Sequence, residues 1–125
     1  MAAGFWKRLL SAAMGEGRPN GREELSQEEA RPLQEQGYVR RHYYFSGRVQ
    51  EVGFRYTAFA LSSRLGLTGW VLNLPDGRVE MEVQGKAETV DLLLVRLGSA
   101  GRISIEQTQE EDCPLCREER FEVIG

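Results

Sequence analysis

The stretch from Ser46 to Arg55, Ser-Gly-Arg-Val-Gln-Glu-Val-Gly-Phe-Arg, has the residue types and spacing of an anion-binding turn. The residues before it have the pattern of a strand, and those after it have the pattern of a helix. Where a strand passes through a glycine-containing loop into a helix, several backbone N–H groups point at one place and attract an anion. Arg55 lies near the helix start, where its planar guanidinium can bind two oxygens of a phosphate or carboxylate. The stretch therefore predicts a small oxyanion pocket.

Nucleotide-binding loops have a different spacing. Gly47 and Gly53 are followed by Phe54 and Arg55, where a P-loop requires Lys and then Ser or Thr. The dinucleotide fingerprint fails as well, because the third glycine and the acidic residue after a second parallel strand are missing. Neither a nucleoside triphosphate nor a dinucleotide is therefore the expected ligand.

The elements that must position this turn follow from hydrophobic periodicity. In the first strand, from Arg40 to Val49, Tyr43 and Phe45 lie on one face and His42 lies on the other. Two later segments repeat apolar residues every three or four positions, which is the period of a helix. A Pro-Asp-Gly turn joins two further strands as a hairpin. The expected later elements are a helix at 54–65, strands at 67–73 and 78–84, a helix from Gly85 to Gly98, a strand from Ile103 and a short strand at 121–123.

This order of strand, helix, strand, strand, helix and strand is the split βαβ pattern of a ferredoxin-like α+β sandwich. We expect one mainly antiparallel sheet of four to five strands, with two helices on one face. Many unrelated functions use this fold, so the fold alone does not identify the function.

The chain divides at about residue 40. Its 125 residues are enough for one domain, and the apolar fraction of 41% is compatible with one core. Residues 15–36 have hardly any apolar side chains and cannot offset their ordering entropy by burial, so we interpret them as a linker or a transient helix. We therefore expect a flexible N-terminal extension at 1–39 and a globular domain at 40–125.

Ahead of that linker, residues 5–13 have an amphipathic pattern in which Lys7 and Arg8 oppose the apolar side chains. This segment is suited to weak contact with a partner or a membrane surface, and the alternative is a frayed tail without function. The two basic residues interrupt the apolar run that a secretory signal needs, and no stretch reaches the length of a transmembrane helix. We expect no membrane span.

Charge and cysteine content exclude further classes. The net charge is -3 and no basic face indicates nucleic acid as a partner. Cys113 and Cys116, with the single histidine of the chain, cannot supply four ligands to a structural zinc ion. Their loop is polar and has acidic neighbours, which does not favour a redox pair. We expect two ordinary thiols in a reducing cytoplasm and no metal.

Two motifs of the sequence resemble the acylphosphatases. They are the stretch from Gly47 to Arg55 and the stretch from Gly69 to Glu80, Gly-Trp-Val-Leu-Asn-Leu-Pro-Asp-Gly-Arg-Val-Glu. The likeness covers about residues 40–125, and two motifs at fixed separation within a matching order of elements are specific. The sequence departs from the family at Glu51, where the family usually has glycine.

The resemblance implies hydrolysis of the carboxyl-phosphate bond of small acyl phosphates without metal or cofactor, and we expect a cytoplasmic monomer. By position, Asn73 would orient the attacking water. Arg55 would bind the phosphoryl group together with loop amides, those of Gln50, Glu51, Val52, Gly53 and Phe54. The leaving group is a carboxylate, whose conjugate acid has a pKa of about 4, so no general acid is needed. Positioning and stabilisation of charge on the phosphoryl oxygens can then suffice.

Two alternatives remain open. A binding module could hold an acyl phosphate or another small oxyanion without hydrolysing it, which Glu51 favours and which Arg55 with Asn73 disfavours. An interaction protein could instead act through its tail or through the loop from Cys113 to Cys116. Turnover of a simple acyl phosphate separates hydrolysis from binding, and deletion of either segment tests the interaction protein.

Overall fold

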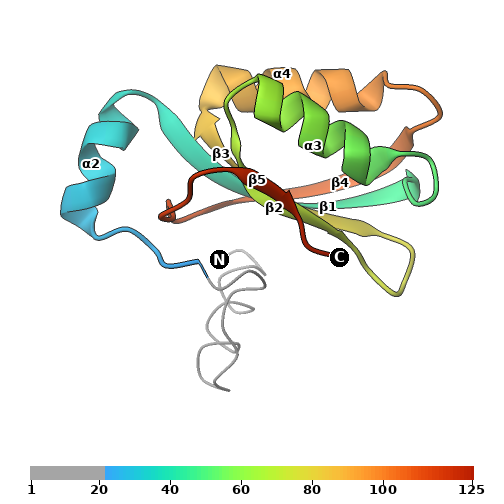
Figure 1. The fold of residues 1–125 in the computed structure, drawn as a ribbon, viewed down its shortest axis with the longest axis horizontal. Coiled ribbons are helices and arrows are strands. Elements are labelled where there is room, and N and C mark those ends of the chain that lie inside the picture. The colour runs from blue at the N-terminus through green and yellow to red at the C-terminus, as the bar shows by residue number, and fades with distance from the viewer. Residues whose placement is uncertain (1–21) are drawn as a thin grey trace.

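The computed structural model describes residues 22–125, so the amphipathic segment at 5–13 lies outside the described residues. Figure 1 shows one sheet with α3 and α4 side by side on one of its faces, while α2 lies beyond the end of the sheet. The elements are α2 (Gln27–Glu35), β1 (Tyr38–Arg48), α3 (Phe54–Arg64), β2 (Thr68–Asn73), β3 (Val79–Lys86), α4 (Ala87–Gly98), β4 (Ser104–Cys113) and β5 (Phe121–Val123).

The strand order in the sheet is β4-β1-β3-β2-β5. Neighbouring strands are antiparallel except β2 and β5, which are parallel. The two helical crossovers lie on one face, which is the split βαβ arrangement. The expected ferredoxin-like α+β sandwich is therefore confirmed, with β5 as the added strand.

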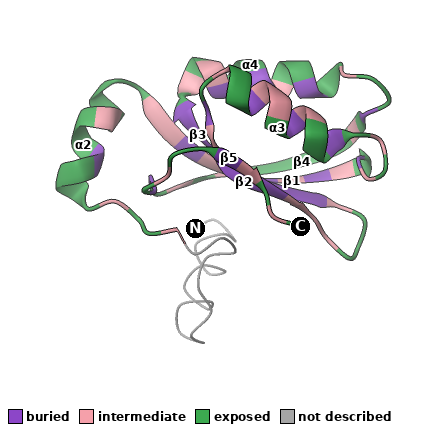
Figure 2. Cartoon of the chain, viewed as in Figure 1, coloured by how far each residue is buried: buried purple, intermediate pink, exposed green. Residues whose placement is uncertain are grey.

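The core lies between the sheet and the two helices (Figure 2). Tyr43 and Phe45 of β1 are fully buried there, and their rings stack with centroids 5.4 Å apart. Phe54 brings the start of α3 onto this layer, with its ring centroid 5.1 Å from that of Phe45. The strand faces expected for Tyr43 and Phe45 are confirmed, and the packing of Phe54 fixes where α3 begins.

One predicted boundary is wrong. The sequence pattern placed Gly85 at the start of the second helix, whereas the structure continues β3 through Gly85 and begins α4 at Ala87. Gly85 is paired with Val39 of β1, and a Cβ built on it would lie 2.3 Å from a methyl carbon of Leu67. A side chain at this position would displace the Leu67 side chain, a constraint between neighbouring strands that periodicity along one segment does not reveal.

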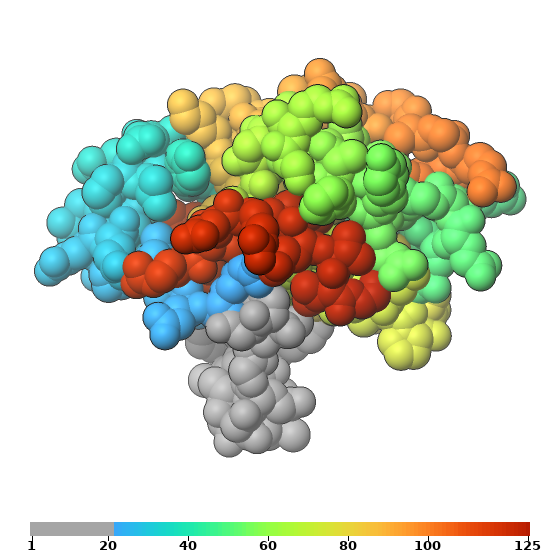
Figure 3. Space-filling view, viewed as in Figure 1, coloured from blue at the N-terminus to red at the C-terminus, as the bar shows by residue number. Residues whose placement is uncertain are grey.

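The segment before β1 differs from the expected linker or transient helix over the residues that the structure describes. Helix α2 has a complete capping box, in which the Ser26 hydroxyl accepts from the Glu29 amide and the Glu29 carboxylate accepts from the Ser26 amide. The preceding residues are paired with the C-terminal part of the chain, since the Leu25 amide donates to the Leu115 carbonyl at 2.9 Å. In Figure 3 the blue atoms of the described N-terminal segment lie beside the red atoms of the C-terminal segment.

An ionic cluster lies on the sheet face opposite α3 and α4. The Glu118 carboxylate, whose side chain is 0% exposed, bridges the guanidinium groups of Arg40 and Arg22 at 2.6 Å each. Arg40 also contacts Glu82 at 2.6 Å, and Glu82 in turn contacts a ring nitrogen of His42 at 2.6 Å. These contacts connect β1, β3, the segment after β4 and the residue that begins the described chain. The cluster therefore holds residue 22 on the domain.

Candidate active site

The loop between β1 and α3 has the backbone conformation of an anion-binding nest. Glu51 has a φ of 60° and is the one non-glycine residue with a positive φ among residues 22–125. Gly53 has a φ of 82° and a ψ of 15° and is the N-cap of α3. Left-handed residues in such a loop turn successive backbone N–H groups toward one concave side. The amides of residues 50–54 are therefore available to an anion at the helix start.

Helix α3 adds its own N-terminus to this concavity. No side chain caps the helix, and the first amide that closes a helical turn is that of Thr57, which donates to the Gly53 carbonyl at 2.9 Å. The amides of the preceding turn have no intrahelical acceptor, and the helix dipole favours an anion beside them. Arg55 lies in this turn, and its side chain is exposed.

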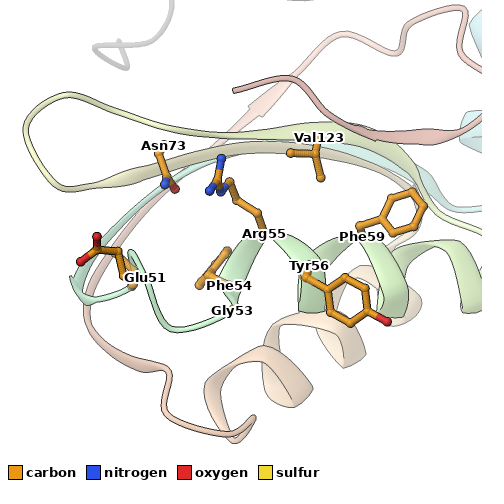
Figure 4. A pocket seen from close by; sticks show the side chains of 9 residues that line it. Glu51, Gly53, Phe54, Arg55, Tyr56, Phe59, Asn73 and Val123 are labelled. Atoms are coloured by element: carbon orange, nitrogen blue, oxygen red, sulfur yellow. The ribbon is translucent and has the colours of Figure 1, made fainter.

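The Arg55 guanidinium reaches across to the end of the chain that the structure describes. Its Nη1 donates to the main-chain oxygen of Gly125 at 2.8 Å. The same oxygen accepts from the backbone amide of Asn73 at 3.1 Å. Gly125 therefore connects the Arg55 side chain to the backbone of Asn73. Figure 4 shows the guanidinium of Arg55 pointing toward Asn73.

Asn73 ends β2 at the edge of this site. Its Oδ1 is buried and accepts no hydrogen bond from the residues that the structure describes. A buried carbonyl oxygen of this kind requires a donor, and a water molecule or a substrate hydroxyl can supply one. The side chain can therefore hold a small polar molecule next to Arg55.

Together these residues line one hollow of about 400 Å³. Five of the site residues that the sequence analysis named line it: Arg55, Asn73, Glu51, Gly53 and Phe54. The remaining lining residues are apolar or aromatic: Val49, Tyr56, Phe59 and Val123. The predicted loop residues Gln50 and Val52 belong to the same loop, but neither lines the hollow.

Gln50 and Val52 anchor the loop instead. Val52 packs against the hydrophobic core. The side-chain amide of Gln50 donates to the Leu74 carbonyl at 2.8 Å and to the Arg78 carbonyl at 2.9 Å. It thereby ties the loop to the β2–β3 hairpin immediately after Asn73. The sequence interpretation assigned Gln50 a backbone role only, and no local pattern reveals a contact with residues so far along the chain.

No cluster of His, Cys, Asp and Glu side chains suited to a metal ion is found in the described part of the chain. The hollow offers one guanidinium, backbone amides and an asparagine amide, which are all groups that bind oxyanions. A sandwich of this fold with such a site at the β1–α3 loop has the groups that an oxyanion ligand requires.

Comparison with known proteins identifies the class. The family model described as Acylphosphatase matches residues 41–123, and the chain belongs to this family. It is 41% identical over 81 residues to an acylphosphatase of Bifidobacterium longum, which covers 64% of this chain and 84% of the relative. It is 55% identical over 53 residues to an acylphosphatase of Nostoc sp., which covers 42% of this chain and 52% of the relative. That stretch spans about half the length of the Nostoc relative.

Solved structures support the same assignment. An acylphosphatase from Coxiella burnetii superimposes with a TM-score of 0.66 and 29% sequence identity, covering 71% of this chain and 95% of the other. No helix in residues 22–125 is both long and apolar enough to cross a lipid bilayer.

Proposed function

We propose that this chain hydrolyses the carboxyl-phosphate bond of small acyl phosphates, as a monomer in the cytoplasm. The observation that carries the proposal is that Arg55, Asn73 and the loop residues Glu51, Gly53 and Phe54 line one hollow at the start of α3 (Figure 4). The names of the related proteins support the activity.

Arg55 and the loop amides would bind the phosphoryl oxygens. Charge accumulates on these oxygens as the phosphoryl group transfers, and preorganised donors stabilise it most in the transition state. Asn73 Oδ1 would accept from the attacking water, since it is buried beside the hollow and accepts no other described hydrogen bond. The two side chains then have separate roles, because Arg55 binds the anion and Asn73 orients the nucleophile.

The reaction balances without a general acid. The water oxygen bonds to phosphorus while the bond from phosphorus to the acyl oxygen breaks, and the electron pair leaves with the carboxylate. An acyl phosphate dianion and water thus give a carboxylate and dihydrogen phosphate. Because the leaving carboxylate is a weak base, with a conjugate-acid pKa of about 4, it departs without a proton.

Phosphate release from benzoyl phosphate by the purified protein tests the proposal. Arg55→Ala and Asn73→Ala should each lower kcat/KM by at least about 10²-fold, the scale for loss of one preorganised donor. Arg55→Ala should also weaken inhibition by inorganic phosphate, whereas Asn73→Ala should leave it nearly intact. Arg64→Ala is the matched control, because Arg64 is exposed at the other end of α3.

The outcomes separate the alternatives. Phosphate binding that depends on Arg55, without turnover of any acyl phosphate, would identify a binding module. Equal loss of phosphate affinity in both variants would contradict the separate roles of Arg55 and Asn73. Light scattering at several protein concentrations tests the monomer, and a mass that doubles with concentration would refute it.

A further inference from the structure

The hollow beside Arg55 has an apolar half that the phosphoryl chemistry does not use. Five large hydrophobic side chains are exposed in residues 22–125, and three of them, Tyr56, Phe59 and Val123, line this hollow. Their exposed fractions are 74%, 41% and 46%. The other two are on α4, away from the hollow. An apolar cluster of this kind next to a polar site indicates a surface that contacts a ligand.

The positions of these side chains follow from the elements that carry them. Phe59 is four residues after Arg55 on α3, so the two side chains lie one turn apart on the same side of the helix. Tyr56 is three residues before Phe59 and is its neighbour on the helix surface. Val123 comes from β5, which lies beside β2. Figure 4 shows Val123 and Phe59 on one side of the Arg55 guanidinium and Asn73 on its other side.

This arrangement fixes the direction of the acyl group if the proposed function holds. In phosphoryl transfer the attacking and leaving oxygens lie roughly in line on opposite sides of phosphorus. The water held by Asn73 is on one side of Arg55, so the leaving carboxylate must point to the other side. That direction leads to Phe59 and Val123. The route toward the β2–β3 hairpin is closed, because Gln50 bridges the loop to the Leu74 and Arg78 carbonyls.

We infer that Tyr56, Phe59 and Val123 form the acyl-binding subsite and that it selects uncharged, apolar acyl groups such as aryl or alkyl chains. Apolar surface that enters this subsite leaves water, which favours a longer or aromatic acyl group. Arg55 is the one cationic side chain among the lining residues, and it is engaged by the phosphoryl group. An acyl group with a second carboxylate would therefore meet apolar side chains and no second cation among the residues that line the hollow. This inference rests on the proposed function.

A series of acyl phosphates tests the subsite: acetyl, butyryl, benzoyl and succinyl phosphate. A fully buried methylene favours binding about 4-fold, and a half-open subsite should give about 2-fold per methylene in kcat/KM. The kcat/KM for benzoyl phosphate should exceed that for acetyl phosphate by about 10-fold. The kcat/KM for succinyl phosphate should be lower than that for butyryl phosphate. In Phe59→Ala the ratio of benzoyl to acetyl kcat/KM should fall at least about 5-fold. In Phe59→Arg the order of succinyl and butyryl phosphate should be reversed, so that kcat/KM is higher for succinyl phosphate than for butyryl phosphate.

The control is Val95→Ala, because Val95 is exposed on α4 and does not line the hollow. It should leave all the ratios unchanged. Circular dichroism and melting temperature show whether each variant is folded. Ratios that stay the same in Phe59→Ala and Phe59→Arg would overturn the subsite. A change in oligomeric state in Phe59→Ala with unchanged ratios would also overturn it, since the patch would then be covered by a second copy.

Binding of stable phosphonates separates failure of this inference from failure of the proposed function. Phenylphosphonate and methylphosphonate carry the same anion and differ in the apolar group, so their ratio of dissociation constants reports the subsite without turnover. Suppose that no acyl phosphate is hydrolysed, that phenylphosphonate binds tighter than methylphosphonate, and that this difference is lost in Phe59→Ala. The subsite is then supported and the proposed hydrolysis is refuted. If hydrolysis occurs and both phosphonates bind equally in wild type and variant, the subsite is refuted.

Discussion

Replacing Glu51 separates backbone strain from charge in the phosphate-binding loop. Glu51 is held at a φ of 60°, a conformation that costs a residue with a Cβ about 1–2 kcal/mol. Glycine has no such cost in the folded state. It also gives the unfolded chain more conformational freedom, which lowers the free energy of unfolding by about 0.4–1 kcal/mol. Glu51→Gly should therefore stabilise the protein by about 0.5–1 kcal/mol. For a domain of this size the melting temperature should rise by about 2–6 °C.

The charge of Glu51 should have a smaller effect on ligand affinity. The side chain is exposed, and Figure 4 shows its carboxylate pointing away from Arg55. Across water, two unit charges several ångströms apart repel each other by less than about 1 kcal/mol. Glu51→Gln keeps the Cβ, so we expect an unchanged melting temperature and a phosphate inhibition constant lowered by less than about 5-fold. That decrease should disappear at 1 M salt, where the screening length is about 3 Å.

Calorimetric melting and phosphate inhibition at low and high salt are the two assays. Gly53→Ala is the reverse control, because Gly53 has a φ of 82° and a Cβ built there would meet no atom within 4 Å. It adds strain without a clash and should lower the melting temperature by a similar amount. If Glu51→Gln raises the melting temperature as much as Glu51→Gly, backbone strain is not the cause. A lower melting temperature in Glu51→Gly would refute a left-handed residue at this position.

Two further predictions concern the ionic cluster. A chain that begins at Tyr38 should have a melting temperature at least about 5 °C below that of a chain that begins at Arg22. The shorter chain lacks the Arg22–Glu118 ion pair and α2. Equal melting temperatures would show that this segment contributes no stability. Burial lowers the pKa of His42, but hydrogen bonds to Glu80 and Glu82 outweigh it and raise that pKa above its usual value. This stabilisation is full below the unfolded pKa of about 6.5 and is lost as pH rises through the raised folded pKa. The free energy of unfolding, measured with denaturant across that pH range, should fall with pH in wild type but not in His42→Gln. The same dependence on pH in both proteins would contradict a stabilising role for protonated His42.

The sequence was informative wherever an element follows from its own local pattern. The strand alternation that predicted Tyr43 and Phe45 in the core, and the apolar repeat that predicted α3, both lie within single segments. The loop residues and Arg55 were grouped as predicted anion ligands for the same reason, since the loop and the start of α3 are continuous in sequence. Asn73 was placed through the resemblance to the acylphosphatases, and the structure brings it to the same hollow.

What the sequence did not reveal depends on contacts between distant segments. Arg40 and Glu118 are far apart in the chain, and their pairing depends on the path of the segment after β4, which no periodic pattern specifies. Helix α2 had a readable signal, because Ser26 and Glu29 have the spacing of a capping box. The low apolar content around that box led us to expect no stable helix, and its stability comes from contacts with the domain.

The two hydrogen bonds from Gln50 have a consequence for motion in the site. They join the loop that presents the phosphate-binding amides to the hairpin that continues from Asn73. When the hairpin moves, the loop must then move with it. The distance between the bound nucleophile and the phosphorus atom therefore varies less than it would if the two segments moved independently. Most of the entropy of bringing these two groups together has been lost at folding rather than at each turnover. Insertions in the turn at residues 75–77 should therefore change the position of the phosphate-binding loop, although that turn lies outside the hollow.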